Sequence, residues 1–466
     1  MKRRNFLKTT AGAAVGATVL TNPVSASVAG KAKKRIVMVG TGVRGTSFWG
    51  RNVIEKYGDL VEFVGLCDIN PGRLEYAKEY IGIDCPVYTD FDKMMEEQKP
   101  EMVIVTTMDS THHEFIIKGL GYGVDVLTEK PLTTDEVKAQ AIIDAEKESG
   151  KKVIVGFNYR YATLLSAFKE ELAKKPTGQI TSVDFHWYLN TYHGASYFRR
   201  WHGERDKSGT LLVHKATHHF DLLNWLIDSD PVEVEAYGDL EHYGKNNEFR
   251  GSNCRNCAYT DKCKFYWDIT KSKRDMDLYV NNEKYDGYVR DNCLWRDEVD
   301  IYDKMAVQIK YANNVQVSYS LTTYSPYEGW RIAFNGKNGR LESWLDLPWR
   351  KSDKINQAEM HTAEMNQKDS GDAHYEEIFW MENFNPDYEI IKVRSSKGGH
   401  GGGDTRLQDK IFKTPDMDDP YKHAAGSRDG VMAAIIGIAA RKSIEEKRPV
   451  KIEELIDIKP HPTRGV

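Results

Sequence analysis

The segment IVMVGTGVRG at positions 36–45 constrains the fold of this chain more than any other. Its unbroken apolar run is typical of a strand that is buried on both faces of a parallel sheet. The G-x-G-x-x-G turn that follows permits a sharp bend and lets a pyrophosphate approach the backbone. Residues 46–57 can continue as a helix, so we expect a strand–turn–helix unit that binds a dinucleotide.

The next strand supports this interpretation. Residues 61–67 predict a strand that ends in Asp68, where a carboxylate binds the ribose hydroxyls of the cofactor. Asp68 favours NAD over NADP because a 2′-phosphate would face a negative charge, although the nearby Arg73 weakens that preference. Further strands at 102–105, 124–128 and 152–156 alternate with helical segments, which predicts a doubly wound α/β domain.

Length and charge limit the remaining possibilities. A chain of 466 residues is too long to fold around one hydrophobic core of ordinary size, so we expect two domains. The net charge is −4 and no basic stripe is present, which argues against a nucleic-acid partner. Outside the N-terminus no apolar run approaches the roughly 20 residues that span a bilayer, so we expect no membrane insertion.

Residues 1–29 have the layout of an export signal, with a basic start, a short apolar core at 11–20 and small residues for cleavage. Their RRNFLK segment resembles the twin-arginine signal, although Lys2 stands where Ser or Thr is usual. Because that route exports folded proteins, we expect a periplasmic protein that carries its cofactor with it.

Several motifs together resemble the glucose–fructose oxidoreductase/inositol dehydrogenase (Gfo/Idh/MocA) family. They are GTGVRG, Asp68, TTMDSTHHE with His112, the Glu129-Lys130-Pro131 triplet and VGFNYRY. The resemblance implies a Rossmann domain at 30–157 and a second α+β domain at 158–466 with a large open, mainly antiparallel sheet. It also implies a homodimer or homotetramer that pairs through this sheet.

The resemblance places the chemistry at three residues. Lys130 is expected beside the nicotinamide and the reacting hydroxyl. His218 matches the histidine of the family's L-D-x-G-x-H-x-x-D motif, and His214 stands where the family has aspartate. A general base that titrates near neutral pH suits hydroxyl oxidation. The expected cofactor-binding residues are Gly40, Gly42, Val43, Arg44, Gly45, Asp68, Arg73, Thr107, His112, Glu129, Lys130 and Asn158.

Aromatic and polar residues suggest a carbohydrate substrate, because aromatic rings cover the apolar face of a sugar while polar groups bind its hydroxyls. Such residues cluster at 187–202, although alternating aromatics also pack ordinary sheets. The KGGHGGG loop at 397–403 resembles loops in the glycoside-cleaving branch of the family. The expected substrate contacts are Tyr192, Arg200, Trp201, His202, His219 and His400.

Four of the six cysteines fall in a predicted insertion at about 245–300. The spacing suits a structural zinc site, which would stabilise an inserted loop that has no hydrophobic core of its own. Its ligands would be Cys254, Cys257, Cys263 and Cys293. Two disulfides or an iron–sulfur cluster are the alternatives in an exported protein. None of the three assigns these cysteines to catalysis.

Three functions remain open. The first is a nicotinamide-dependent oxidoreductase acting on a sugar or glycoside hydroxyl, with a tightly held and internally recycled cofactor. The second is a glycosidase that cleaves by transient C3 oxidation and elimination. The third is a sugar-binding protein without turnover.

Overall fold

The computed structural model describes residues 32–347, 356, 375–395 and 399–465. The predicted signal at 1–29 lies outside the described residues, as do Lys397 and Gly398 of the glycine–histidine loop. The two sheets that follow belong to one compact unit, residues 33–466.

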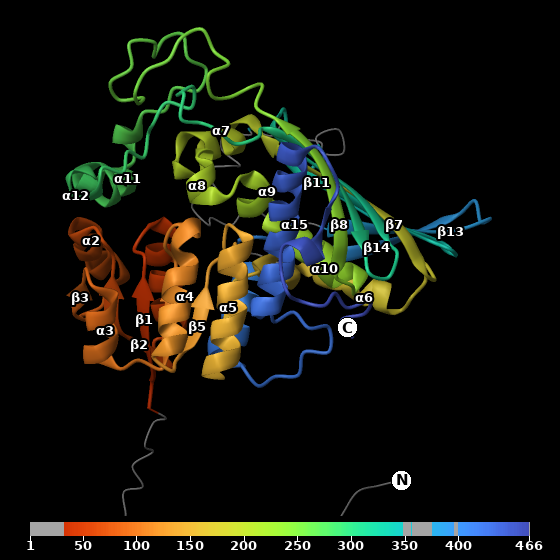
Figure 1. The fold of residues 1–466 in the computed structure, drawn as a ribbon, viewed down its shortest axis with the longest axis horizontal. Coiled ribbons are helices and arrows are strands. Elements are labelled where there is room, and N and C mark those ends of the chain that lie inside the picture. The colour runs from red at the N-terminus through yellow and green to blue at the C-terminus, as the bar shows by residue number, and fades with distance from the viewer. Residues whose placement is uncertain (1–31, 348–355, 357–374, 396–398, 466) are drawn as a thin grey trace, which may run out of the picture. The chain divides into compact units, whose positions relative to one another are not determined.

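The first sheet is parallel throughout, in the order β3-β2-β1-β4-β5-β6 (Figure 1). Its strands are β1 (Lys34–Val39), β2 (Val61–Cys67), β3 (Val87–Tyr88), β4 (Met102–Val105), β5 (Asp125–Thr128) and β6 (Val153–Val155). Its helices are η1 (Arg44–Arg51), α1 (Asn52–Tyr57), α2 (Pro71–Ile81), α3 (Phe91–Gln98), α4 (His112–Gly121) and α5 (Glu136–Ser149). This is the predicted Rossmann-type arrangement.

Alternation along the strands explains why helices cover both faces of this sheet. Ile36 and Met38 of β1 pack with Phe48 and Leu74 on one face, whereas Val37 and Val39 pack on the other with residues of α3, α4 and α5. Because both faces are buried, the strands read as continuous apolar runs. The same property made them recognisable in the sequence.

The second sheet is mixed and mostly antiparallel, in the order β14-β13-β12-β11-β7-β10-β9-β8-β15, with β7 and β10 parallel. Its strands are β7 (Ile180–Asn190), β8 (Pro231–Asp239), β9 (Lys304–Tyr311), β10 (Gln316–Ser325), β11 (Gly329–Gly336), β12 (Gly339–Leu345), β13 (Tyr375–Glu382), β14 (Tyr388–Arg394) and β15 (Val450–Lys451). The α+β class expected for this domain is confirmed.

Helices cover one face of this sheet and connect it to the first domain. They are α6 (Thr163–Ala173), α7 (Thr191–Arg199), α8 (Arg205–Ser208), α9 (Leu211–His214), α10 (Ala216–Ile227), α14 (Gly403–Gln408) and α15 (Ser427–Glu446). The buried helix α15 contacts α10, β8 and α9 of the second domain and α5 and β6 of the first (Figure 1). At Gly437 an added Cβ would lie 2.3 Å from the Leu212 carbonyl oxygen, so a small residue is required there. Within the described residues, no helix is both long and apolar enough to cross a membrane.

The predicted insertion lies between β8 and β9. It contains η5 (Ile269–Lys271), α11 (Lys273–Leu278), η6 (Val280–Asn282) and α12 (Glu283–Asp286). Helix α11 and η6 contact α2 of the first domain, and Figure 1 shows α11 and α12 beside it. The insertion therefore reaches back to the edge where a dinucleotide is expected.

Candidate active site

The glycine turn has the tight geometry that its sequence predicts. Gly40 has a φ of +92°, and a Cβ on it would lie 2.6 Å from backbone atoms of Thr106 and Thr107. A Cβ on Gly45 would lie 2.4 Å from the Gly40 carbonyl oxygen. At Gly42 the nearest atom to an added Cβ is the Tyr279 hydroxyl, 3.6 Å away, which is an ordinary van der Waals contact. The turn thus has the close-packed backbone of a pyrophosphate-binding G-x-G-x-x-G turn, with Tyr279 of the insertion lying against it.

The carboxylate of Asp68 is buried behind that turn. One oxygen accepts hydrogen bonds from the Thr41 amide at 2.7 Å and hydroxyl at 2.9 Å, and the other from the Asn70 amide at 2.9 Å. Arg73 pairs with Asp68 at 3.1 Å and also with Asp286 of the insertion. Because two carboxylates neutralise Arg73, its guanidinium is poorly suited to bind a 2′-phosphate.

Glu129 and Arg44 form a partly buried pair that orients the residues after β5. The Glu129 carboxylate accepts from Arg44 Nε at 2.6 Å and from the Trp49 indole at 2.7 Å. Burial raises the pKa of Glu129, but the charges of Arg44 and Lys130 outweigh it and hold that pKa below its usual range. Arg44 therefore positions Glu129 in addition to belonging to the turn.

His112 acts on the backbone around this site. Its Nδ1 lies 2.8 Å from the Pro131 carbonyl oxygen and its Nε2 lies 3.2 Å from that of Thr107. The ring is 1% exposed. His112 therefore links the loops after β4 and β5, so the structure assigns it to positioning.

Lys130, His214 and Asp109 meet between the two domains. Lys130 Nζ donates to the His214 carbonyl oxygen at 3.3 Å, and His214 Nδ1 lies 2.5 Å from Asp109 Oδ2. Burial lowers the pKa of Lys130 to about 8. Burial also raises the pKa of Asp109 well above its usual range and lowers that of His214. The contact between Asp109 and His214 thus favours one proton shared by the two side chains and no net charge on the pair.

His218 lies one turn after His214, near the start of α10. Its ring centre is 4.8 Å from that of Tyr159 and 5.9 Å from that of Phe157. Nδ1 is buried without a hydrogen-bond partner among the described residues. Burial, followed by the charge of Lys130, lowers its pKa well below the usual range, so the ring is neutral.

The glycine–histidine loop brings His400 to the same place. His400 lies 5.2 Å from Tyr159 between ring centres, and its Nδ1 lies 3.0 Å from Asp404 Oδ2. Asp404 also accepts from Asn158 Nδ2 at 2.6 Å. A Cβ on Gly399 would lie 2.3 Å from Asp404, which explains a glycine at that position. Asp404 is a positioning residue that the sequence reasoning passed over.

The predicted substrate residues divide into two groups. His202 stacks on Trp201 with ring centres 3.6 Å apart and lies 4.2 Å from His214, and Arg200 lies beside them. Tyr192, in contrast, is 49% exposed at the start of α7. His219 is fully buried, stacks on Trp187 at 4.0 Å and binds the Tyr319 hydroxyl at 2.7 Å. His219 therefore packs in the core of the second domain in this structure, and its role as a substrate contact stays a prediction.

The zinc prediction is not supported. The described part of the chain contains no group of three or more histidine, cysteine and acidic side chains placed to hold a metal ion. All six cysteines, which lie within the described residues, are free thiols, so the disulfide alternative finds no support either. Cys254, Cys257, Cys263 and Cys293 do line one pocket, where Arg199 donates to Cys254 Sγ at 2.7 Å. This guanidinium occupies part of the space around the sulfur that a metal would need.

Two family models match the chain. The model of the oxidoreductase family's NAD-binding Rossmann fold (GFO_IDH_MocA) matches residues 34–157, and that of its C-terminal alpha/beta domain matches residues 169–452. YteT of Bacillus subtilis, whose name gives it as an oxidoreductase and states no substrate, is 35% identical over 91% of this chain and 99% of its own length. The inositol 2-dehydrogenase/D-chiro-inositol 3-dehydrogenase of Lactiplantibacillus plantarum is 26% identical over 44% of this chain and 55% of that protein.

Solved structures share the fold. An oxidoreductase domain protein from Kribbella flavida has a TM-score of 0.63 at 16% identity, covering 90% of this chain and 99% of that one. The WlbA dehydrogenase from Bordetella pertussis, solved with NADH and UDP-GlcNAcA, has a TM-score of 0.58 at 17% identity, covering 90% and 99%. At these identities the likeness extends to the fold alone.

Proposed function

Because the chain belongs to the Gfo/Idh/MocA family of NAD-binding oxidoreductases, we propose that it oxidises or reduces a hydroxyl of a sugar or glycoside with an NAD that stays bound. The observation that carries this proposal is the meeting of Lys130, His214 and Asp109 near His218, between the glycine turn and the aromatic residues of the second domain. When bound, the nicotinamide supplies hydride transfer to or from the sugar carbon.

The protein supplies the proton transfer. A neutral Lys130 amine accepts the hydroxyl proton as the carbon is oxidised, and its lowered pKa makes that form accessible near neutral pH. The neutral His218, whose Nδ1 has no partner among the described residues, is available to hydrogen-bond the same hydroxyl. Asp109 binds the His214 ring, and the backbone carbonyl oxygen of His214 accepts a hydrogen bond from Lys130 Nζ. In this arrangement the His214–Asp109 pair replaces the first aspartate of the family motif.

Contacts from the insertion support retention of the cofactor. The Tyr279 hydroxyl accepts a hydrogen bond from the Val43 amide at 2.9 Å, directly at the glycine turn. The Asn282 carbonyl oxygen accepts from Asn70 at 2.9 Å, and Asp286 pairs with Arg73. A dinucleotide that binds the turn and Asp68 would have these residues of the insertion beside it, and movement of the insertion would accompany its exchange.

The test uses the purified full chain. We expect denaturation to release NAD, and a panel of sugars added to the native protein to change the absorbance of the reduced nicotinamide. The Lys130→Met variant should retain the nucleotide and lose turnover by about a hundredfold or more, whereas Lys151→Met, on an exposed loop, should behave as wild type. Full activity in Lys130→Met would overturn the assignment.

Redox-neutral glycoside cleavage is the second candidate, and the position of His400 beside Tyr159 favours it. In that scheme the C3 hydroxyl is oxidised, the C2 proton and the C1 leaving group depart, water adds at C1, and C3 is reduced again. Incubation with aryl glycosides without added NAD separates the candidates. Aglycone release without net keto sugar indicates cleavage, whereas keto sugar that accumulates with an acceptor indicates a dehydrogenase. An unchanging nicotinamide band with every sugar would indicate binding without turnover.

We also propose that residues 1–29 direct export of the folded, cofactor-loaded protein. The support is the RRNFLK segment together with the need to carry a cofactor that is scarce outside the cytoplasm. Replacing both Arg3 and Arg4 with lysine should leave the full-length protein in the cytoplasm. A mature protein that still reaches the periplasm in this variant would contradict the twin-arginine route.

A further inference from the structure

The carboxylate that is expected to bind the cofactor ribose has its acceptor positions filled by groups of the chain itself. Asp68 Oδ2 accepts from the amide and the hydroxyl of Thr41, at 2.7 and 2.9 Å. Asp68 Oδ1 accepts from the Asn70 amide at 2.9 Å and from Arg73 Nη2 at 3.1 Å. Two carboxylate oxygens offer about four lone pairs, so a ribose hydroxyl can donate to Asp68 only if one of these donors moves away.

Arg73 is a donor that already has a second acceptor. The same Nη2 donates to Asp286 Oδ2, at the end of α12 in the insertion. The side chains of Asp68, Arg73 and Asp286 are only 7%, 11% and 10% exposed, so water screens their charges little. Burial lowers the pKa of Arg73, but the two carboxylates outweigh it and raise that pKa above its usual range. Asp286 can therefore keep Arg73 when a ribose takes its place on Asp68.

The contact between Asp286 and Arg73 belongs to a larger interface between the insertion and α2. The Tyr288 amide donates to Asp286 Oδ1 at 3.2 Å, which fixes the carboxylate. The Asn282 carbonyl oxygen accepts from Asn70 Nδ2 at 2.9 Å, just before α2 begins. A Cβ on Gly72 would lie 1.9 Å from Asn282 Oδ1, so the two segments meet closely. Asp286 thus reaches the ribose end of the site from a surface packed against it.

We propose that Asp286 is a specificity-determining residue, through which the insertion makes this chain select a dinucleotide with a free ribose 2′-hydroxyl over one with a 2′-phosphate. When NAD binds, Arg73 stays on Asp286, and the freed lone pair of Asp68 accepts from a ribose hydroxyl. A 2′-phosphate would instead face two carboxylates and a guanidinium that Asp286 already engages. This inference rests on the proposed function, because it concerns the cofactor of the same site.

The experiment is a competition between two nucleotides on the full chain, and it requires neither turnover nor a known sugar. The purified protein is incubated with equal concentrations of NAD and NADP until the bound nucleotide no longer changes in composition. Unbound nucleotide is then removed, the protein is denatured, and the released nucleotides are quantified by mass spectrometry. We expect the wild type to release mainly NAD, and Asp286→Asn to lower the ratio of NAD to NADP by at least about tenfold.

Two further variants serve as comparisons. Asp286→Glu keeps the negative charge and should retain part of the preference for NAD. Asp277→Asn is the matched control, because it removes a carboxylate from the same insertion at a residue that pairs with the exposed Lys273. Its nucleotide ratio should equal that of the wild type. Circular dichroism of each variant verifies its fold.

A double variant tests the role of Arg73. Adding Arg73→Met to Asp286→Asn should abolish the gain in NADP binding, because no guanidinium is left to bind the phosphate. A gain that survives would contradict the step through Arg73. A ratio in Asp286→Asn within about twofold of the wild-type ratio overturns the proposal but leaves the proposed function intact, as does a wild type that binds both nucleotides equally. A wild type that binds neither nucleotide contradicts the proposed function as well.

Discussion

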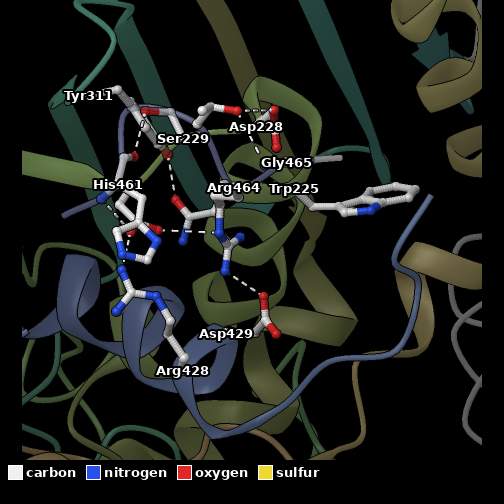
Figure 2. Close-up of polar contacts among 12 residues, drawn as sticks. Trp225, Asp228, Ser229, Tyr311, Arg428, Asp429, His461, Arg464 and Gly465 are labelled. Atoms are coloured by element: carbon white, nitrogen blue, oxygen red, sulfur yellow. Dashed lines mark hydrogen bonds and ion pairs between the residues drawn. The ribbon is translucent and has the colours of Figure 1, made fainter. Parts of the chain in front are cut away.

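Buried charges at the ends of the second-domain helices contrast with those at the candidate active site. Figure 2 shows Arg464 of the C-terminal tail paired with Asp429. Arg464 and Arg428 both pair with Asp230, which also accepts a hydrogen bond from the His461 amide. Each cation in that cluster has a carboxylate partner. In contrast, Arg200 and Arg290 form no ion pair with a carboxylate among the described residues; Arg290 lies beside Tyr279 and Tyr288, and the charge of Asp275 contributes to raising its pKa.

Helix α10 belongs to both regions. His218 faces the ring of Tyr159 at the candidate site, whereas Asp221, three positions later, accepts two hydrogen bonds from Arg160 at 2.5 and 2.8 Å. Both residues match the same family motif. The first environment leaves polar atoms without a partner, and the second satisfies them. Charge balanced within the chain serves stability, whereas a buried polar atom without a partner beside groups of shifted pKa indicates a candidate functional site.

The largest expected effect is on the pair of Asp221 and Arg160, whose charges balance each other. Asp221→Asn leaves Arg160, which is 1% exposed, without its bidentate partner, and breaking such a pair costs about 3–5 kcal/mol of unfolding free energy. Urea denaturation of the purified variant measures this loss. The double variant Arg160→Met/Asp221→Leu should regain much of it because it buries no unpaired charge. A loss below about 1 kcal/mol for the single variant would contradict the structural role of this pair.

The next effect concerns the proton-transfer residues. Asp109→Asn keeps the shape of the side chain but alters the proton shared with His214, so we expect turnover to fall by about a hundredfold. The thermal midpoint and the bound nucleotide should remain near wild type, which distinguishes Asp109 from Asp221. An unchanged rate with a lowered midpoint would reverse that distinction.

The pH profile gives a smaller effect. Sugar oxidation needs the neutral Lys130 amine, and burial lowers the Lys130 pKa to about 8. The neutral fraction therefore rises with pH, so kcat/KM for oxidation should increase up to about pH 8 and then level off. Residual activity of Lys130→Met should lack this increase. A profile that falls over the same range would assign the base to another group.

The smallest effect is expected at the surface. Arg51 and Glu55 form an ion pair at 2.7 Å with side chains 47% and 56% exposed. Solvent and salt screen such pairs, so Glu55→Gln should leave the urea midpoint and turnover within replicate error. A measurable drop would show that exposure is a poor guide to the role of charge in this chain.

Much of the first domain could be predicted from the sequence because its signals are local. The runs at 61–67 and 102–105 are the observed β2 and β4, and the glycine turn has its expected backbone. Lys130, His214, His218 and His400 were found as candidates because short motifs carry them. The structure gathers the three histidines around Lys130 and Tyr159.

Other parts of the site had no local signal. Asp109 stands in a quoted motif but gave no indication that it meets His214, 105 positions away. Tyr279 and Arg290 lie in an insertion without a recognisable pattern. The buried position of His219 against Trp187 also had no local signal, because the sequence shows that a histidine is present but not which way its ring points on the helix.

The sequence by itself determined the two-domain fold, the dinucleotide turn and the lysine and histidines of the candidate site, because periodicity and short motifs act over a few residues. The tertiary structure decided which charges are paired with an opposite charge and which buried polar atoms have no partner among the described residues. That outcome depends on contacts between distant segments, such as Tyr279 with Val43 and Asp286 with Arg73. The free energy of a buried charge depends on every group packed around it, and only the folded chain brings those groups together.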